Sequence, residues 1–352
     1  MNPLKTLNML PRYLFPSDYM ADPAGHVFND RLYIYPSHDR QCNNVFDDDG
    51  GHFQMRDYHV LSFDDVEQGH ATDHGVILDQ EQVPWVEKQM WDSDVVEKDG
   101  RYYLVFSAKD RGGEFRLGVA VAERPEGPFT AQEHPIRGAY SIDPCVFRDD
   151  DGSIYCYYGG LWGGQLQWHV PLGVRPVRLP DTAAAPAGYV DIGHASDRKT
   201  ELWAPADAPA LPSYVARMTD DVMQFTEAPR PVVILEGGGE PLRAADPHRF
   251  FEASWMHKYR GRYYFSYSTG DSHLLCYATG DNPYGPFTYQ GVILEPVVGW
   301  TTHHSIVEFR GQWYLLYHDC VPSGGITHLR SLKAQRLFYN PDGSIQTVAN
   351  EG

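Results

Sequence analysis

Cysteine is scarce in this 352-residue sequence, and the cysteines that are present form no recognisable pattern. The five residues are scattered and include no CxxC pair: Cys42, Cys145, Cys156, Cys276 and Cys320. An odd and dispersed set argues against a disulfide framework and against a cysteine-rich zinc motif. We expect reduced thiols that pack as small hydrophobic groups, which favours a cytoplasmic location.

Basic residues and long apolar runs are also scarce. Lysine and arginine number 29 against 47 aspartates and glutamates, which gives a formal net charge of -18. This balance excludes the basic patches that bind nucleic acid or anionic membranes. No stretch approaches the roughly 20 apolar residues that span a bilayer, and residues 1–20 lack the apolar core of a signal peptide. The sequence therefore predicts a soluble cytoplasmic protein whose partner is neither nucleic acid nor membrane.

Glycine, proline and aromatic residues are abundant, and they are organised as a repeat. Five segments each place a tight turn before an aromatic run: "NDRLYIY", "DGRYYLVF", "DGSIYCYY", "RGRYYFSY" and "RGQWYLLY". Four of the five have glycine as the second turn residue, as a two-residue hairpin loop prefers, and Asp30 is the exception. The central tyrosines of the five runs are Tyr33, Tyr103, Tyr155, Tyr264 and Tyr314. Each segment predicts a hairpin turn followed by a β-strand.

The spacing of these tyrosines is that of propeller blades. We predict an all-β protein in which residues 1–352 form a single five-bladed β-propeller, without a C-terminal β-sandwich. The widest gap, between Tyr155 and Tyr264, predicts an insertion of roughly 50 residues, within approximately residues 160–250, that runs as surface loops. A second repeated motif, "ERPEGPF" and "DNPYGPF", is expected in the outer parts of two blades. A β-sandwich with coincidental aromatic runs is the alternative.

Polar residues recur at nearly one position upstream of each tyrosine. Counting back 9 to 12 residues reaches an acid in four repeats and a histidine in the fifth: Asp22, Asp94 or Asp92, Asp143, Glu252 and His303. The strand before each turn is the innermost strand of a blade, so these side chains can meet in the central channel. A one-residue slip reverses the direction of a side chain in a strand, so the loops must absorb the unequal offsets.

Carboxylates that converge in a channel repel one another unless they share protons or gain a cation. Such a site pushes pKa values apart and leaves one protonated acid beside one ionised base. Glycoside hydrolysis with inversion uses this pair, with a gap between the two carboxylates that admits water. The pattern therefore fits a glycosidase, which inverts configuration if the gap between its two carboxylates admits water.

The residues around these positions resemble a known family. "ADPAGHVFNDRLYIYPSHD", "WDSDVVEKDGRYYLVFSA", "SIDPCVF", "FFEASWMHKYRGRYYFSYS" and "TTHHSIVEFRGQWYLLYHD" look like the blade motifs of glycoside hydrolase family 43. This family contains five-bladed, inverting β-xylosidases and α-L-arabinofuranosidases. The likeness covers about residues 18 to 343 and includes a closing segment, "YNPDGSI".

The resemblance implies roles for three carboxylates. Asp22 resembles the general base, Glu252 the general acid, and Asp143 the third carboxylate, which orients the acid and tunes its pKa. The alternative for Asp22 and Asp143 is a turn aspartate, since each precedes proline. Glu201 in "TELWAP" competes with Glu252, but it lies in the insertion and no tyrosine anchor follows it.

The resemblance also implies a metal site at the axis. His303 and Ser305 match the family's motif, in which the histidine holds calcium or another divalent cation that is otherwise ligated mainly by water. The alternative is a hydrogen-bonded core histidine without metal. A zinc site is not expected, because no close set of three or four suitable ligands occurs in the sequence.

Four residues are expected to bind substrate. Trp91 and Asp94 resemble the sugar-lining motif of the second blade, although "WDSD" replaces the commoner "WAPD". Arg330 resembles an arginine that contacts the base or a sugar hydroxyl, and His38 ends a strand close to Asp22. Blade packing for Trp91 and a surface ion pair for Arg330 are the alternatives.

The sequence as a whole predicts an exo-acting, inverting glycosidase that releases a terminal pentose from short oligosaccharides. β-1,4-Xylosidase is the first assignment, and α-L-arabinofuranosidase or a bifunctional enzyme is the alternative. Retaining fructan and sucrose hydrolases share a similar propeller, but their "NDPNG" and "EC" signatures are missing. A non-catalytic sugar-binding propeller is the alternative outside the enzymes, and assembly into a homo-oligomer stays open.

Overall fold

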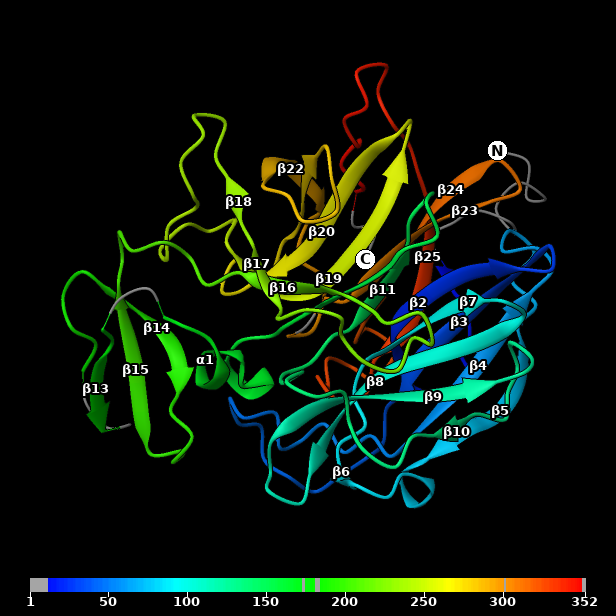
Figure 1. Ribbon diagram of the computed structural model, residues 1–352, viewed down its shortest axis with the longest axis horizontal. Helices are drawn as coiled ribbons and strands as arrows, with labels where there is room; N and C mark the ends of the chain where they lie inside the picture. Colours follow the sequence, from blue (N-terminus) through cyan, green and yellow to red (C-terminus); the bar gives the residue numbers. More distant parts are fainter. Residues whose placement is uncertain (1–11, 173–174, 181–183, 301, 350–352) are drawn as a thin grey trace.

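The chain forms a series of β-sheets that correspond to the predicted repeats (Figure 1). This computed structural model describes residues 12–172, 175–180, 184–300 and 302–349. The first blade contains β2 (Met20–Phe28), β3 (Arg31–His38), β4 (Asp57–Phe63) and β5 (Thr72–Asp79). The second contains β7 (Ser93–Lys98), β8 (Arg101–Asp110), β9 (Phe115–Ala122) and β10 (Thr130–Ala131), and the short β6 (Val86–Lys88) also pairs with β8.

The other three blades follow in chain order. The third contains β11 (Cys145–Arg148), β12 (Ile154–Tyr158), β16 (Ser213–Arg217) and β17 (Arg230–Val232). The fourth contains β19 (Phe250–Tyr259), β20 (Arg262–Thr269), β21 (Leu275–Gly280) and β22 (Phe287–Leu294), with β18 (Ile234–Leu235) parallel to β22. The fifth contains β23 (His304–Phe309), β24 (Gln312–Asp319) and β25 (Ser331–Leu337), and β1 (Arg12–Tyr13) pairs with β25.

The first strands of the five blades form a closed ring. In chain order β2 contacts β7, β7 contacts β11, β11 contacts β19, β19 contacts β23, and β23 returns to β2. The pairing of β1 with β25 joins the N-terminal part of the described chain to the last blade, so the circle is also closed at its rim. The predicted five-bladed β-propeller is confirmed, and the second strand of each blade carries its tyrosine anchor.

The turn chemistry follows the prediction in four blades. Both turn residues have positive φ at Asn29 and Asp30, Asp99 and Gly100, Arg260 and Gly261, and Arg310 and Gly311. Type I′ hairpins need this conformation, and an aspartate tolerates it better than most residues, which accounts for Asp30. The third blade differs, because a longer loop over residues 149–153 joins β11 to β12. Asp149 in that loop accepts hydrogen bonds from Lys258 and Tyr263 of the fourth blade.

The second repeated motif contributes to packing between blades. "ERPEGPF" joins β9 to β10 and "DNPYGPF" joins β21 to β22, as the prediction placed them. The buried Tyr35 donates its hydroxyl to the carbonyl of Pro125 at 2.8 Å, and Tyr157 donates to the carbonyl of Pro283 at 2.6 Å. An aromatic second strand thus reaches the proline loop of another blade, which satisfies a buried hydroxyl and ties the two blades together.

The insertion has about the predicted length of roughly 50 residues, but it ends well before residue 250 and is partly folded. β16 and β17 lie within the predicted range of about 160–250, yet they pair with β12 and with each other in the third blade. Among the described residues, the segment between β12 and β16 is the part that leaves the third blade. This segment contains η3 (Trp162–Gly164), α1 (Leu166–His169) and a three-stranded sheet of β13 (Val177–Pro180), β14 (Tyr189–His194) and β15 (Thr200–Pro205), at the left of Figure 1. The composition of the segment suggested loops because it is rich in alanine and proline.

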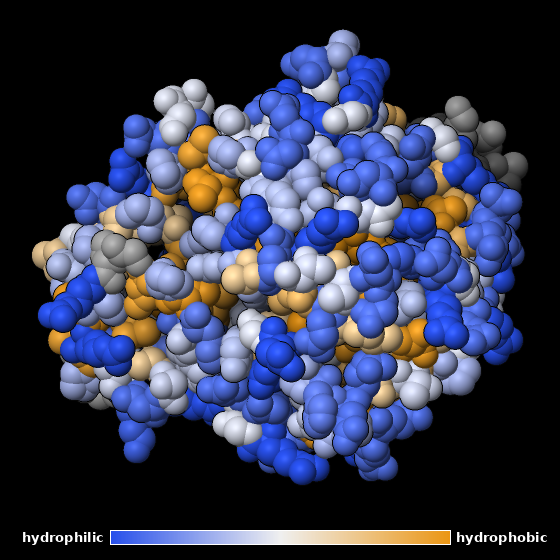
Figure 2. Space-filling model, in the orientation of Figure 1, coloured by the Kyte–Doolittle hydropathy of each residue, from blue (hydrophilic) through white to orange (hydrophobic). Residues whose placement is uncertain are grey.

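Helix is a minor component of the described chain. Besides η3 and α1 it includes η2 (Gln80–Gln82), and no helix among the described residues has the length and apolarity to cross a membrane. The face drawn in Figure 2 is mostly hydrophilic with scattered apolar patches, in keeping with the large negative charge.

Candidate active site

One small cavity gathers most of the predicted site residues. Its lining comes from all five blades and from the loop after β3: Asp22, Phe53, Met55, Trp91, Asp92, Ile142, Asp143, Glu252, His303 and Arg330. Six predicted site residues are among them, including the three carboxylates, His303, Trp91 and Arg330. The carboxylates are almost completely buried, so their ionisation depends on one another and on the nearby cations.

Local backbone distortions aim the three carboxylates into this cavity. Asp22 has φ 52° where the pairing of β2 with β3 shifts register, and Asp143 has φ 58° just before β11. In β19 the register shifts on both sides of Glu252, and the next residue, Ala253, has φ 64°. β-Bulges redirect side chains and absorb an extra residue, and strained φ values concentrate at functional sites. The register shifts in β19 account for the longer offset of Glu252, whereas the longer loop before β12 accounts for that of Asp143, so the prediction that loops absorb the difference holds in the third blade.

Arg330 holds the predicted base in place and in its ionised form. Its Nη1 donates to Asp22 Oδ1 at 2.7 Å, while its Nη2 and Nε donate to the two carboxylate oxygens of Asp39 at 2.7 and 2.9 Å. Burial alone would raise the pKa of Asp22, but the charges of Arg330, His318 and His303 lower it to about 2. Asp22 Oδ2 is buried and accepts no hydrogen bond from the described residues. The structure thus presents an ionised carboxylate with one oxygen available.

Glu252 has the opposite electrostatic environment. Burial is the main cause that raises the pKa of Glu252 to about 7, and the negative charges of Asp92 and Asp22 add to it, while His303 opposes the shift. Two carboxyl groups of one cavity therefore titrate far apart, with Asp22 ionised and Glu252 protonated in weakly acidic solution.

Asp143 braces the backbone next to the predicted acid. Its Oδ2 accepts a hydrogen bond from the N–H of Ala253 at 2.8 Å and lies 3.0 Å from His303 Nε2. Burial and the charge of Glu252 raise the pKa of Asp143 well above its usual value. The contact with Ala253 fixes the bulge that carries Glu252, which agrees with the expected orienting role.

In the second blade the cavity contains Asp92, and the prediction that Asp94 binds substrate is corrected. Asp92 Oδ1 lies 3.2 Å from His303 Nδ1, and burial together with the charges of Asp143 and Asp22 raises the pKa of Asp92 well above its usual value. Asp94 instead bonds His26 at 2.5 Å and accepts the N–H of Val146 at 2.7 Å. It lines a separate cavity of the inner strands, about 430 Å³, that shares no residue with the carboxylate cavity.

His38 also lies outside the carboxylate cavity, so its predicted substrate role is corrected as well. Its ring pairs with Asp57 at 2.5 Å and with Asp18 at 3.3 Å. The following residue, Asp39, points toward Arg330 instead, as expected for successive residues at the end of a strand.

The apolar wall of the cavity is formed by aromatic side chains that pack around Trp91. Trp91 packs against Phe115 and Phe53, with ring centroids 4.4 and 5.9 Å apart, and donates its indole N–H to the carbonyl of Phe53. These contacts show the packing role weighed for Trp91, and its role in binding a sugar stays a prediction. Phe53, Trp162 and Trp300 were missed by the sequence analysis, because they lie on loops outside the repeat.

An adjoining cavity extends the site past Glu252. It shares Phe53, Trp91 and Glu252 with the first cavity, and it is further lined by Asp47, Asp48, Gly50, His52, Leu161, Trp162, Gly163, Gly164, Phe251 and Trp300. The rings of Trp162 and Trp300 lie 5.8 Å apart. Glu252 thus lines both the carboxylate cavity and an adjoining cavity with an aromatic wall.

Asp22, Asp92 and His303 form a candidate cation site. One ligand atom from each residue lies within 4.8 Å of the others, and Asp92 Oδ1 and Asp22 Oδ2 are buried without a hydrogen-bond partner among the described residues. Calcium takes six to eight mainly oxygen ligands, so two carboxylates and one imidazole fit it only with water in the remaining positions. A cation would offset the repulsion among the buried acids.

Comparison with known proteins identifies similar chains. A sequence profile described as Glycosyl hydrolases family 43 matches residues 69–172. A β-xylosidase of Xylanibacter ruminicola is 62% identical over 97% of this chain and 100% of the relative, and a xylosidase/arabinosidase of Bacteroides ovatus is 57% identical over 96% and 97%. The structure of CoXyl43, a family 43 β-xylosidase/α-arabinofuranosidase from a compost metagenome in complex with xylotriose in calcium-free form, superposes with a TM-score of 0.86 at 50% identity, covering 97% of this chain and 99% of that one.

Proposed function

Because this chain belongs to family 43 of the glycosyl hydrolases, we propose that it is an exo-acting, inverting β-xylosidase that releases xylose from short xylo-oligosaccharides. The observation that carries the mechanism is the separation of two pKa values in one cavity, about 2 for Asp22 and about 7 for Glu252. An ionised base beside a protonated acid is what hydrolysis with inversion requires.

Asp22 acts as the general base. Arg330 occupies Asp22 Oδ1, so the unpaired Oδ2 is the atom that accepts a proton from water as the water attacks the anomeric carbon. Asp39 fixes Arg330 through two parallel hydrogen bonds, a geometry that holds the guanidinium in one orientation. Asp39 and Arg330 thereby position the base without touching the reacting atoms.

Glu252 acts as the general acid, and it gives its proton to the glycosidic oxygen as the bond to the anomeric carbon breaks. The proton that leaves Glu252 and the proton that Asp22 takes from water balance over one turnover. Asp143 assists by holding the N–H of Ala253, which keeps the bulge and the acid side chain in register with the substrate.

The two cavities support an exo mode of action. In this proposal the carboxylate cavity with Trp91 and Phe53 takes the terminal pentose, and the adjoining cavity with Trp162 and Trp300 offers aromatic faces to the rest of the oligosaccharide. Sugar rings pack their apolar C–H faces on aromatic side chains, while hydroxyls need hydrogen-bond partners such as Asp22 and Arg330. The proposed substrate is neutral, in keeping with an acidic protein.

Arabinosidase activity on α-L-arabinofuranosides is proposed as a second activity of the same site. It is supported by the relatives that carry both activities in their names, at 57% identity for the Bacteroides ovatus protein and 54% for a protein of Humicola insolens. The cytoplasmic location and a homo-oligomeric state stay predictions. The five unpaired cysteines support a reducing compartment.

We further propose that calcium binds at His303, with Asp92 beside it and water in most of the other positions, so that Asp22 Oδ2 stays free to act as the base. The donor set fits a hydrated cation, and a family 43 structure solved in a calcium-free form implies a calcium site in relatives. Bound calcium supplies positive charge that offsets the clustered carboxylates. His303 lies between Asp92 and Asp143 and contacts both, so it helps to hold the two acids in place.

Release of p-nitrophenol from the β-xyloside and the α-L-arabinofuranoside tests the function. The matched control is Glu201→Ala, because Glu201 lies on β15 of the insertion, outside both cavities. We expect the wild-type and Glu201→Ala proteins to cleave the xyloside, and we expect Glu252→Ala to lose far more of its activity on xylobiose, whose leaving group needs the proton. Absence of activity on both p-nitrophenyl substrates would overturn the hydrolase assignment, and full activity of Glu252→Ala on xylobiose would overturn the acid assignment.

A further inference from the structure

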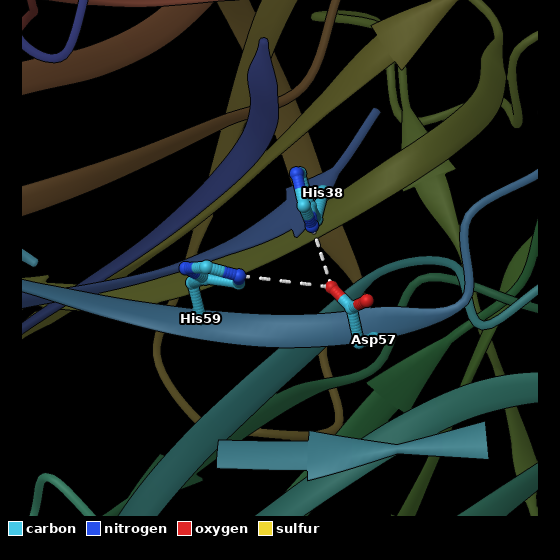
Figure 3. Close-up of side chains that lie close together, drawn as sticks. All are labelled: His38, Asp57 and His59. Atoms are coloured by element: carbon cyan, nitrogen blue, oxygen red, sulfur yellow. Dashed lines mark hydrogen bonds and ion pairs between the residues drawn. The ribbon is translucent and has the colours of Figure 1, made fainter. Parts of the chain in front are cut away.

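We propose that His38, Asp57 and His59 form a second metal site, one that binds a divalent transition metal such as zinc. One ligand atom from each residue lies within 4.8 Å of the others. The cluster lies on the first blade and shares no residue with the carboxylate cavity. Figure 3 shows the two imidazole rings directed at the same oxygen of Asp57.

The strand register creates this cluster. Ser37 of β3 pairs with Tyr58 of β4, so the next pair outward places His38 opposite Asp57. His59 lies two residues beyond Asp57 on the same strand and projects from the same face of the sheet. Three ligand side chains on two paired strands are preorganised without any loop having to fold around the metal.

The distances between the ligand atoms suit a small metal ion that replaces the proton shared by His38 and Asp57. His38 Nδ1 lies 2.5 Å and His59 Nε2 lies 3.8 Å from Asp57 Oδ1. Ligands about 2 Å from a tetrahedral zinc ion stand roughly 3.3 Å apart, between these two values. The short contact of His38 with Asp57 has the length of a hydrogen bond, so the ion takes the place of that proton.

The outer contacts of both histidines match those of metal ligands. His38 Nε2 lies 3.3 Å from a carboxylate oxygen of Asp18, and His59 Nδ1 lies 3.1 Å from Asp73. Metal-bound imidazoles usually give their second N–H to a carboxylate, which fixes the tautomer and increases the basicity of the ligating nitrogen. Both rings have this arrangement, and in each the other nitrogen faces Asp57.

The local charge is suited to a divalent cation. Arg40 pairs with the second oxygen of Asp57, so Asp57 is left as a ligand through one oxygen. The carboxylates of Asp57, Asp18 and Asp73 outnumber the single guanidinium by two charges when the imidazoles are neutral. The side chains of His38, Asp57 and His59 are 14%, 1% and 12% exposed, so solvent competes weakly for the ligands.

The ligand types select the metal. Two imidazoles and one carboxylate suit zinc, copper or nickel, whereas calcium takes six to eight oxygen ligands. Three protein ligands leave a fourth position for water. His38 directly precedes Asp39, which holds Arg330 and through it the base, so an ion here tethers the strand end that supports the active site.

A zinc titration monitored by isothermal titration calorimetry tests the proposal. It uses the His303→Gln protein, because this change makes the other candidate metal site, with Asp22 and Asp92, incomplete. In a titration at about pH 8 we expect one zinc ion per chain, because an ordinary imidazole has a pKa of about 6.5. A further His59→Gln change should remove this binding, while Asp73→Asn, which keeps all three ligands, should weaken it about 10- to 100-fold. His74→Gln is the matched control, because His74 lies in the same blade but bonds Ser62 instead.

Two outcomes would overturn the proposal. One is that the protein with the cluster intact binds no zinc at micromolar to millimolar concentrations, which is independent of how any ligand variant folds. The other is that zinc binding survives unchanged in His59→Gln and in Asp73→Asn, each with native circular dichroism. Cobalt substitution gives a second measurement, since four-coordinate cobalt absorbs visible light strongly and the hydrated ion does not.

Discussion

If Glu252 is the general acid, the loss of activity on replacing it should depend on the leaving group of the substrate. Glu252→Gln keeps the shape of the side chain and removes the proton that the acid delivers. A sugar hydroxyl leaves poorly without a proton, so hydrolysis of xylobiose should fall about 10²- to 10⁴-fold. p-Nitrophenolate is a stable anion, so the variant should retain much more of its activity on p-nitrophenyl β-xyloside.

The structure also gives the size of the pH effect. At pH 6 an acid with a pKa of about 7 is about 90% protonated, whereas one at the ordinary value of 4.5 is about 3% protonated. The burial of Glu252 thus increases the competent acid form about 30-fold at this pH. The basic limb of the pH dependence of kcat/KM should accordingly have an apparent pKa near 7.

Initial rates on both substrates from pH 4.5 to pH 9 provide the assay, with Glu201→Gln as the control. Equal losses on xylobiose and on the p-nitrophenyl substrate would refute the acid role, because only proton delivery distinguishes the two leaving groups. A basic limb of the wild-type protein near 4.5 would refute the electrostatic argument.

Three further changes test the remaining parts of the site. Arg330→Met removes the cation that lowers the pKa of Asp22 against burial, so the acidic limb of kcat/KM should move to higher pH, and urea denaturation should show a loss of about 3–5 kcal/mol from the unpaired buried acids. Asp92→Asn should lower kcat/KM, whereas Asp94→Asn should mainly lower the free energy of unfolding, by about 1–3 kcal/mol. If Asp94→Asn instead lowers kcat/KM and Asp92→Asn mainly lowers stability, Asp94 and not Asp92 belongs to the sugar site. Chelation should lower activity and Tm, calcium at about 100 times its Kd should restore about 2.7 kcal/mol of stability, and His303→Gln should abolish this response in differential scanning calorimetry; a full response in that variant would exclude the axial site.

The fold was largely predictable because its signals are local and repeated. The sequence of each blade contains a hairpin turn followed by an aromatic strand. Five such repeats in one chain favour a propeller over other all-β folds. The pairing of β1 with β25 was not predictable, because two residues, Arg12 and Tyr13, carry no periodicity. The insertion was mistaken for loops because its short strands are separated by alanine and proline.

The site was predictable where its residues share a register with the repeat. Asp22, Asp143 and Glu252 were found by counting from the tyrosines, and the cavity contains all three. Asp94 and Asp92 differ by two residues, so both project from the same side of the chain, but about 6.6 Å apart along it. Sequence spacing fixed the direction of these side chains and left their depth along the strand ambiguous.

The aromatic lining could not be predicted in the same way. Trp162 lies in the insertion and Trp300 in the loop before β23, far apart in the chain, and they meet only through the tertiary fold. The two corrected residues show the converse, since His38 and Asp94 lie near the right sequence positions and point elsewhere.

The configuration of the first product tests the central claim most directly. Asp22 as a base and Glu252 as an acid require water to attack from the face opposite the leaving group, so a β-xyloside must release α-xylose first. ¹H NMR spectra recorded during the first minutes of hydrolysis, before mutarotation mixes the anomers, resolve the two anomeric protons. We predict that α-xylose accumulates first; initial accumulation of β-xylose would contradict the account and make one of these carboxylates a nucleophile.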